Sequence, residues 1–224
     1  TQVRGMNVAI RNANDAISLS QTAEGSLSKI NDMGQRMREL AVQSANATNS
    51  DSDRKNLDAE YQALAQEIKR NLAGAAFNGT KLFAAAAALT FQVGANAATT
   101  DQITIKTENL AGENSIVEVI GAAGADAASI GTAAGASAAL GKLDTMLATV
   151  NAKRAEFGAT QNRFEAVIQT LQVSAENQTA ARSRIMDADF ASETAALTRA
   201  QVLQQAGTSM LSQANSLPNN VLSL

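Results

Sequence analysis

Hydrophobic residues recur every three or four positions along the first part of the chain, the spacing that places side chains on one face of a helix. The pattern predicts a first helix from Val3 to Ala45. A polar run, 46–53, ends this helix and offers Ser50 or Ser52 as the N-cap of the next one. The second helix has its own apolar stripe, formed by Leu57, Tyr61, Leu64 and Ile68. Because the connecting loop is short, the two helices are expected to be antiparallel neighbours.

The clearest periodicity follows Gly141, where apolar residues keep a heptad register. We predict that the core of this helix seam consists of Leu143, Leu147, Val150, Phe157, Phe164, Ile168 and Leu171. Because the only proline of the chain is Pro218, the helix can continue for about 70 residues, or about 100 Å at the usual rise per residue. A lone helix cannot bury such a stripe, so the seam is expected to pack on the first two helices.

The middle third of the chain follows a different period. Residues 89–93 and 102–106 alternate apolar with polar side chains, which predicts a hairpin of two half-buried strands. Residues 116–120 are interpreted as a third strand. The stretch from Gly121 to Ala139 consists almost wholly of small residues without a period, which predicts a flexible or loosely packed loop.

The predicted fold is mainly α: a long antiparallel helical rod, similar to a coiled-coil bundle, with a small β-hairpin region in the middle. Four segments follow from this interpretation. They are the first two rod helices at 1–83, the hairpin and Ala/Gly-rich variable region at 84–137, the third rod helix at 138–184, and a carboxyl-terminal segment at 185–224.

The composition argues against an enzyme. The 224 residues include no His and no Cys, which excludes His-dependent triads, thiolate nucleophiles and the usual zinc sites. A net charge of -3, without a cluster of Lys and Arg, predicts that the chain does not bind nucleic acid. The longest apolar run, 82–89, is far too short to span a bilayer. No cofactor is expected.

Two Asp-x-Asp pairs, Asp51/Asp53 and Asp187/Asp189, are the strongest candidates for a metal site. A calcium loop of the EF-hand type that began at Asp51 would need Gly at its sixth position and Glu at its twelfth. The chain has Asn56 and Gln62 there. We therefore predict no metal site and interpret both pairs as helix caps or solvated side chains.

Segments at both ends and in the middle of the chain resemble bacterial flagellin: 11–25, 36–46, 77–82, 91–96, 161–165, 181–185, 204–207 and 213–224. The resemblance implies a helical rod whose copies self-assemble into an exported, extracellular filament that supports motility. It further implies that the amino-terminal core-forming segment of the family is missing ahead of Thr1. The filament-core segment after Ile185 would then lack its packing partner.

The resemblance also implies partners and contact residues. Gln35, Arg36, Leu40 and Glu60 align with positions through which the family contacts both the Toll-like receptor that senses flagellin and neighbouring subunits. Arg36 and Leu40 are four residues apart, so they share one face of the first helix, and an antiparallel return can place Glu60 beside them. The alternative is that the charged residues are merely solvated and that Leu40 belongs to the core. A flagellar export chaperone and a filament cap are further implied partners.

Two classes of function remain. The first is the structural subunit of a bacterial flagellar filament. The second is a surface-displayed, flagellin-like binding protein or adhesin for polysaccharide. Sugar-binding sites favour aromatic faces, and with no Trp and a single Tyr the sequence argues for the first class.

Overall fold

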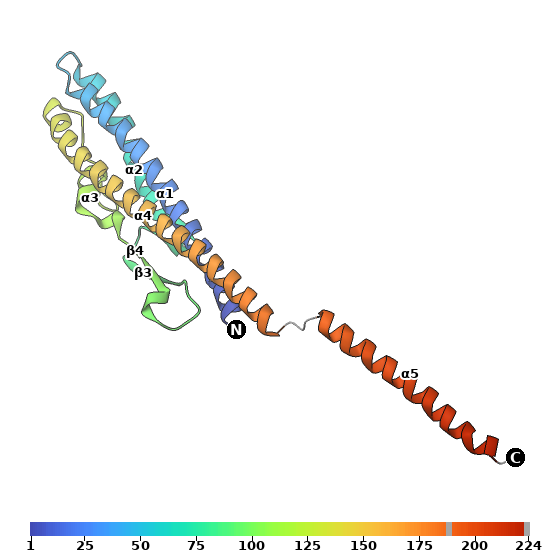
Figure 1. Ribbon diagram of the computed structural model, residues 1–224. Coiled ribbons are helices and arrows are strands. Elements are labelled where there is room, and N and C mark those ends of the chain that lie inside the picture. Colours follow the sequence, from blue (N-terminus) through green and yellow to red (C-terminus); the bar gives the residue numbers. More distant parts are fainter. Residues whose placement is uncertain (187–189, 222–224) are drawn as a thin grey trace. The chain divides into compact units, whose positions relative to one another are not determined.

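The computed structural model describes residues 1–186 and 190–221, with side chains described as far as residue 214. The chain divides into two compact units, Thr1–Ala175 and Glu176–Leu224. In the first unit, long helices lie side by side with short strands near one end of the helices (Figure 1). The predicted fold class, mainly helical with a small antiparallel hairpin region, is confirmed.

The helices α1 (Gln2–Ala45) and α2 (Asp51–Gly74) pack against each other along the first unit. Ser50 is the N-cap of α2, because its side chain accepts a hydrogen bond from the Asp53 backbone N–H while the Asp53 carboxylate accepts one from the Ser50 N–H at 3.0 Å. This reciprocal capping box fixes where the second helix begins. Both helices turn an apolar face inward, and Tyr61 and Ile68 of α2 are fully buried.

The third long helix, α4 (Ala133–Met186), supplies the other side of this core. Of the predicted seam, four side chains are buried and three are half-buried: the buried ones are Leu143, Val150, Phe157 and Phe164, and the half-buried ones Leu147, Ile168 and Leu171. Helices α1 and α4 approach closely at Gly34, where an added Cβ would stand 2.8 Å from the Met146 Cε. Glycine at this position therefore permits the helix contact.

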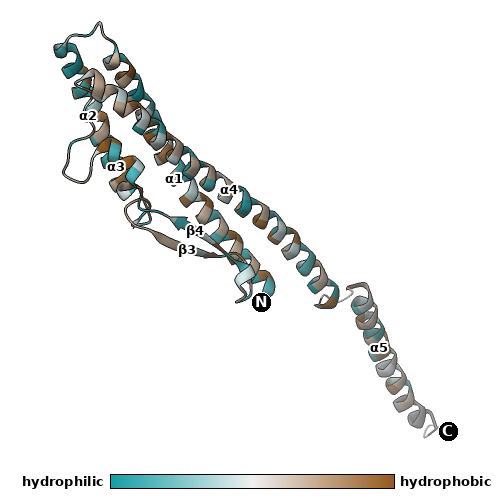
Figure 2. Cartoon of the chain, turned by 90° about the vertical axis from the view of Figure 1, so that its left-hand side faces the viewer, coloured by the Kyte–Doolittle hydropathy of each residue, from teal (hydrophilic) through white to brown (hydrophobic). Residues whose placement is uncertain are grey.

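Two antiparallel hairpins follow α2. The first pairs β1 (Ala76–Phe77) with β2 (Thr80–Lys81), and the second pairs β3 (Ala87–Gln92) with β4 (Gln102–Thr107). The two longer strands match the predicted hairpin within two residues. They lie beside the first half of α1 (Figure 2), where the Asn12 amide donates to the Gln92 carbonyl at 3.0 Å.

The prediction of a third strand at 116–120 is wrong. These residues belong to the short helix α3 (Asn114–Ile120), which ends at Gly121 with φ 79°. Three of them are buried, Ile116, Val119 and Ile120, and their spacing of three and four is helical. A run of four apolar residues around one Glu fits either period, and packing on α2 selects the helix.

The Ala/Gly-rich stretch is ordered to a greater extent than its composition predicts. Helix α4 already begins at Ala133, ahead of the predicted boundary at 138, and Ala136 and Ala139 are buried. Ile130 is fully buried, and its N–H donates to the Asp58 carboxylate at 2.7 Å. The loose packing predicted for 121–139 is therefore wrong, because one large apolar side chain anchors a segment of small ones.

The second unit contains α5 (Phe190–Val221). Its large apolar side chains are exposed: Phe190, Leu197, Val202, Leu203, Met210 and Leu211. The predicted Asp187/Asp189 pair lies outside the described residues. In the part of the chain that the structure describes, no helix combines the length and the hydrophobicity that a membrane crossing requires.

Candidate subunit-contact surface

Arg36 joins the first two helices on their outer side. Its guanidinium contacts Glu60 of α2 at 2.9 Å and Glu39, one turn further along α1, at 3.0 Å. All three side chains remain roughly half exposed or more. Arg36, which like any arginine is always charged, is held between two carboxylates, and its hydrogen bonds to Glu39 and Glu60 raise its pKa further.

The predicted neighbour Leu40 does not belong to this exposed group. Its side chain is 0% exposed and lies in the hydrophobic core. Four residues of an α-helix turn through slightly more than a full circle, and this offset takes Leu40 from the outer face occupied by Arg36 to the buried one. The expectation that Leu40 forms part of an accessible patch is therefore corrected: it supports the helix from inside.

The exposed group consists of four residues, which we call the charged α1–α2 surface: Gln35, Arg36, Glu39 and Glu60. Three of them were predicted from the sequence, and Glu39 was not. The signal that could have found Glu39 is its spacing of three from Arg36, which permits an ion pair on one helix face.

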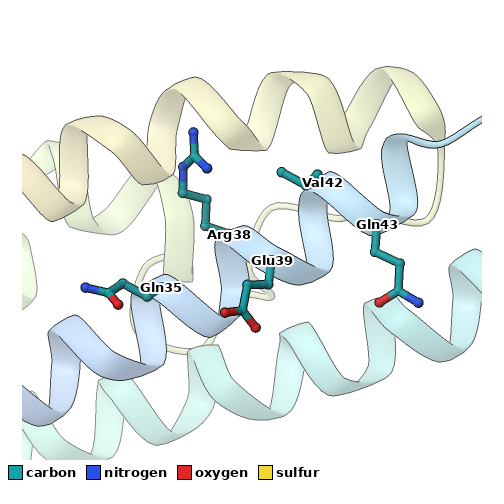
Figure 3. Close-up of a pocket in the computed structure, with 5 residues that line it drawn as sticks. All are labelled: Gln35, Arg38, Glu39, Val42 and Gln43. Atoms are coloured by element: carbon teal, nitrogen blue, oxygen red, sulfur yellow. The ribbon is translucent and has the colours of Figure 1, made fainter.

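A shallow groove runs next to this surface along α1. It has a volume of about 520 Å³ and is lined by Gln35, Arg38, Glu39, Val42 and Gln43. Figure 3 shows Arg38 and Glu39 extending to opposite sides, with Val42 between the charged groups and the end of the helix. Arg38 contacts Asp144 of α4 at 2.7 Å, and this hydrogen bond lowers the pKa of Asp144. Ion pairs thus tie α1 to both neighbouring helices.

Of the Asp51/Asp53 pair, the structure gives Asp53 a capping role. The Ser50 hydroxyl and backbone N–H bond to the Asp53 carboxylate and lower its pKa. Over residues 1–186 and 190–221, no cluster of three or more acidic side chains that could hold a metal ion is present.

Sequence models of two protein-family regions match the chain. The "Bacterial flagellin N-terminal helical region" matches residues 1–88, and the "Bacterial flagellin C-terminal helical region" matches residues 140–224. The chain belongs to the flagellin family. As a flagellin it is a structural subunit of a bacterial flagellar filament and not an enzyme.

Individual relatives agree with this assignment. Flagellin of Halalkalibacterium halodurans is 39% identical over 224 residues, which cover 100% of this chain and 79% of the relative. The flagellar filament 31.3 kDa core protein of Treponema maltophilum is 39% identical over 235 residues, covering 100% of this chain and 81% of that protein. The crystal structure of Bacillus cereus flagellin superposes with a TM-score of 0.61 at 29% identity, covering 77% of this flagellin and 94% of that chain.

The amino-terminal family region is matched from residue 1 onward. The expectation of a missing amino-terminal core-forming segment therefore gains no support from the family match. The relatives named above also give the adhesin alternative no support, since one is named a flagellar filament core protein and the other two are named flagellins.

Proposed function

We propose that copies of this flagellin build an extracellular filament in which the charged α1–α2 surface contacts a neighbouring subunit. The observation that supports this role is the Arg36 junction. A guanidinium bonded to two carboxylates on two helices is held in one orientation while about half of it stays exposed. Arginine is over-represented among the residues that dominate interface energies. Glu39 and Glu60 reduce the entropy that Arg36 would lose on binding.

The same surface is our proposed contact for a host Toll-like receptor, with Gln35, Arg36 and Glu60 facing the partner and Leu40 supporting them from the core. A partner that approaches this face meets one cation flanked by two anions and, in the adjacent groove, the half-exposed Val42. Such a mixture of apolar and charged groups is typical of interface centres. An export chaperone and a filament cap complete the proposed set of partners, in keeping with an exported subunit.

The test is an Arg36→Ala variant. Loss of a dominant interface arginine costs at least about 2 kcal/mol, so receptor signalling is expected to fall about 30-fold. Filaments should become shorter or fewer in electron micrographs of the cells. The circular dichroism melt should stay close to that of the parent, because exposed ion pairs contribute little to stability.

Arg70→Ala is the matched control. Arg70 is an exposed arginine that also pairs with a carboxylate, Glu67, three residues away within α2. Its loss should leave signalling and filaments unchanged. If Arg36→Ala behaves like Arg70→Ala in both assays, the charged α1–α2 surface has neither of the proposed roles.

A further inference from the structure

The first hairpin, β1–β2, is closed by only two residues, Asn78 and Gly79. Phe77 and Thr80 pair on either side of them. Both turn residues have positive φ, 47° for Asn78 and 80° for Gly79, as a type I′ turn requires. Both are exposed, and in the part of the chain that the structure describes Asn78 is the only residue other than glycine with a positive φ. The hairpin therefore presents an asparagine amide at its tip.

The Asn-Gly dipeptide is chemically reactive. The backbone nitrogen of the second residue can attack the side-chain amide carbon of the first, and a side chain on the second residue obstructs this approach. Asn78–Gly79 is the only Asn-Gly pair among the 224 residues. A Cβ added at Gly79 would have no heavy atom of a non-adjacent residue within 4 Å, so the space beside its nitrogen is open. The sequence and the surroundings thus single out the same nitrogen.

Hydrogen bonding also leaves the two reacting groups free. Within the described ranges, no hydrogen bond engages the Asn78 side chain or the Gly79 N–H. Asn49 is a useful comparison, because the next residue, Ser50, is also small. There the Asn49 amide donates to a carbonyl of α1, and the Ser50 N–H donates to the Asp53 carboxylate at 3.0 Å. Both groups are thus occupied at Asn49 and available at Asn78.

The turn itself allows the attack. Ring closure needs the peptide plane between Asn78 and Gly79 to rotate, so that the nitrogen faces the side-chain carbon. Such a rotation converts a type I′ turn into a type II′ turn, which keeps the positive φ of the first central residue. The change of φ falls on Gly79, which accepts either sign. Each strand of this hairpin has two residues, so little strand pairing opposes the rotation.

We propose that Asn78 is a site of spontaneous deamidation. The Gly79 nitrogen gives its proton to hydroxide and bonds to the Asn78 Cγ, and the side-chain nitrogen takes up a proton and leaves as ammonia. The product is a five-membered succinimide. Water then adds to one of the two ring carbonyls and breaks its bond to nitrogen, which gives aspartate at one carbonyl and isoaspartate at the other. The net change is the addition of water and the loss of ammonia, without oxidation or reduction.

The two products differ in their effect on the hairpin. Aspartate keeps the main chain intact and adds a negative charge to a groove that Asn78 lines together with Asp15 and Phe77. Isoaspartate places the side-chain methylene in the main chain, and the longer connection no longer matches a two-residue turn. The pairing of Phe77 with Thr80 is then expected to be lost. Deamidation thus opens the hairpin in the isoaspartate fraction of the molecules.

The test is incubation of the purified parental chain, folded, at neutral and at mildly alkaline pH. Peptide mapping by mass spectrometry, after digestion under acidic conditions that stop the reaction, follows each asparagine. Asn78 should convert to both aspartate and isoaspartate, at a rate that rises in proportion to the hydroxide concentration. Asn49 should react at least about 30-fold more slowly, because two hydrogen bonds must break there first.

Two variants separate the chemistry from its structural effect. Gly79→Ala places a methyl group beside the attacking nitrogen and should slow the conversion of Asn78 to the level of Asn49. Hydrogen exchange at the Leu82 N–H, which donates to the Ala75 carbonyl at 3.0 Å, reports whether the hairpin persists. Asn78→Asp should keep Leu82 protected, whereas the isoaspartate fraction of the aged parent should lose this protection.

Three outcomes would overturn the inference. The first is an Asn78 that keeps its amide in the folded chain but loses it in the urea-unfolded chain, because the turn would then protect the site. The second is conversion of Asn49 as fast as that of Asn78. The third is a product that contains aspartate alone, since a succinimide opens at both carbonyls. The test uses the purified chain, so its result does not depend on filament assembly or on the proposed function.

Discussion

Phe91 of β3 meets Phe164 of α4 edge to face, with ring centroids 5.8 Å apart and planes at 83°. A second such pair joins Phe83 to Phe157, with centroids 6.4 Å apart. Edge-to-face pairs place the positive ring edge on the negative face of the partner ring and are worth about 0.5–1.5 kcal/mol beyond their burial. Both seam phenylalanines of α4 thus hold the hairpin region as well as the helix bundle.

Phe164→Ala is expected to destabilise the first unit by about 3–5 kcal/mol, because it removes a buried ring and leaves a cavity. The midpoint of thermal unfolding, followed by circular dichroism, should fall sharply. Glu165→Ala changes the exposed neighbouring residue and should leave the midpoint nearly unchanged. Equal effects of the two changes would mean that the ring does not pack in the seam.

Two glycines of α1 offer a matched comparison. A Cβ at Gly34 would stand 2.8 Å from Met146 and 2.9 Å from Leu147, whereas a Cβ at Gly25 would have no neighbour within 4 Å. Gly25→Ala should therefore stabilise the chain by up to about 1 kcal/mol through helix propensity. Gly34→Ala gains the same propensity but must displace the ends of the Met146 and Leu147 side chains, which offsets part or all of that gain. Chemical denaturation should show a clearly larger stabilisation for Gly25→Ala than for Gly34→Ala.

The sequence predicted the long helices well because their apolar spacing matches their buried faces. The stripe from Val3 onward located α1 to within one residue of its start, and the polar run 46–53 contained the actual N-cap. The hairpin strands were predicted for the same reason, since Ile103, Ile105 and Thr107 alternate into the core.

The sequence failed where tertiary contacts decide between alternatives. Residues 116–120 fit either a strand or a helix, and Leu40 fits either a surface patch or a core stripe. The groove lined by Asp15, Leu19, Phe77, Leu89 and Phe91 could not be predicted at all, because its residues are far apart in the chain and come together only through the packing of β3 on α1. Periodicity reports which face of an element is buried, but it does not report which elements share a groove.

Polar side chains of α2 hold the backbone of the segment that leads into α4, residues 121–132, through hydrogen bonds. Gln62 exchanges two hydrogen bonds with Ala127, accepting from its N–H at 3.0 Å and donating to its carbonyl at 3.4 Å. Gln62→Ala should therefore speed hydrogen exchange at Ala127 and Ile130 while the global unfolding midpoint changes little. Gln66→Ala, an exposed change one turn along the same helix, is the control. Unchanged hydrogen exchange at Ala127 would show that the two hydrogen bonds of Gln62 do not protect this segment.

Two carboxylates with lowered pKa values predict a specific acid sensitivity. Hydrogen bonds from the hydroxyl and N–H of Ser50 lower the pKa of Asp53, and the Arg38 guanidinium lowers that of Asp144. A lowered folded-state pKa stabilises the protein fully above the unfolded value, which is about 4 for Asp, and the stabilisation is lost as the pH falls through the folded-state pKa. The thermal midpoint should thus decline below about pH 4.

Asp53→Asn should remove part of this decline. At pH 7 the variant loses a charged partner of the capping box and should melt below the parent, and this difference should shrink as the pH falls and Asp53 becomes protonated. Glu165→Gln removes one exposed carboxylate outside the ion pairs and caps described above. Its thermal midpoint should therefore change with pH in the same way as that of the parent. The decisive measurement is the difference between parent and Asp53→Asn at each pH. A difference that stays constant from pH 7 to pH 2 would mean that the capping contribution of Asp53 does not depend on its charge.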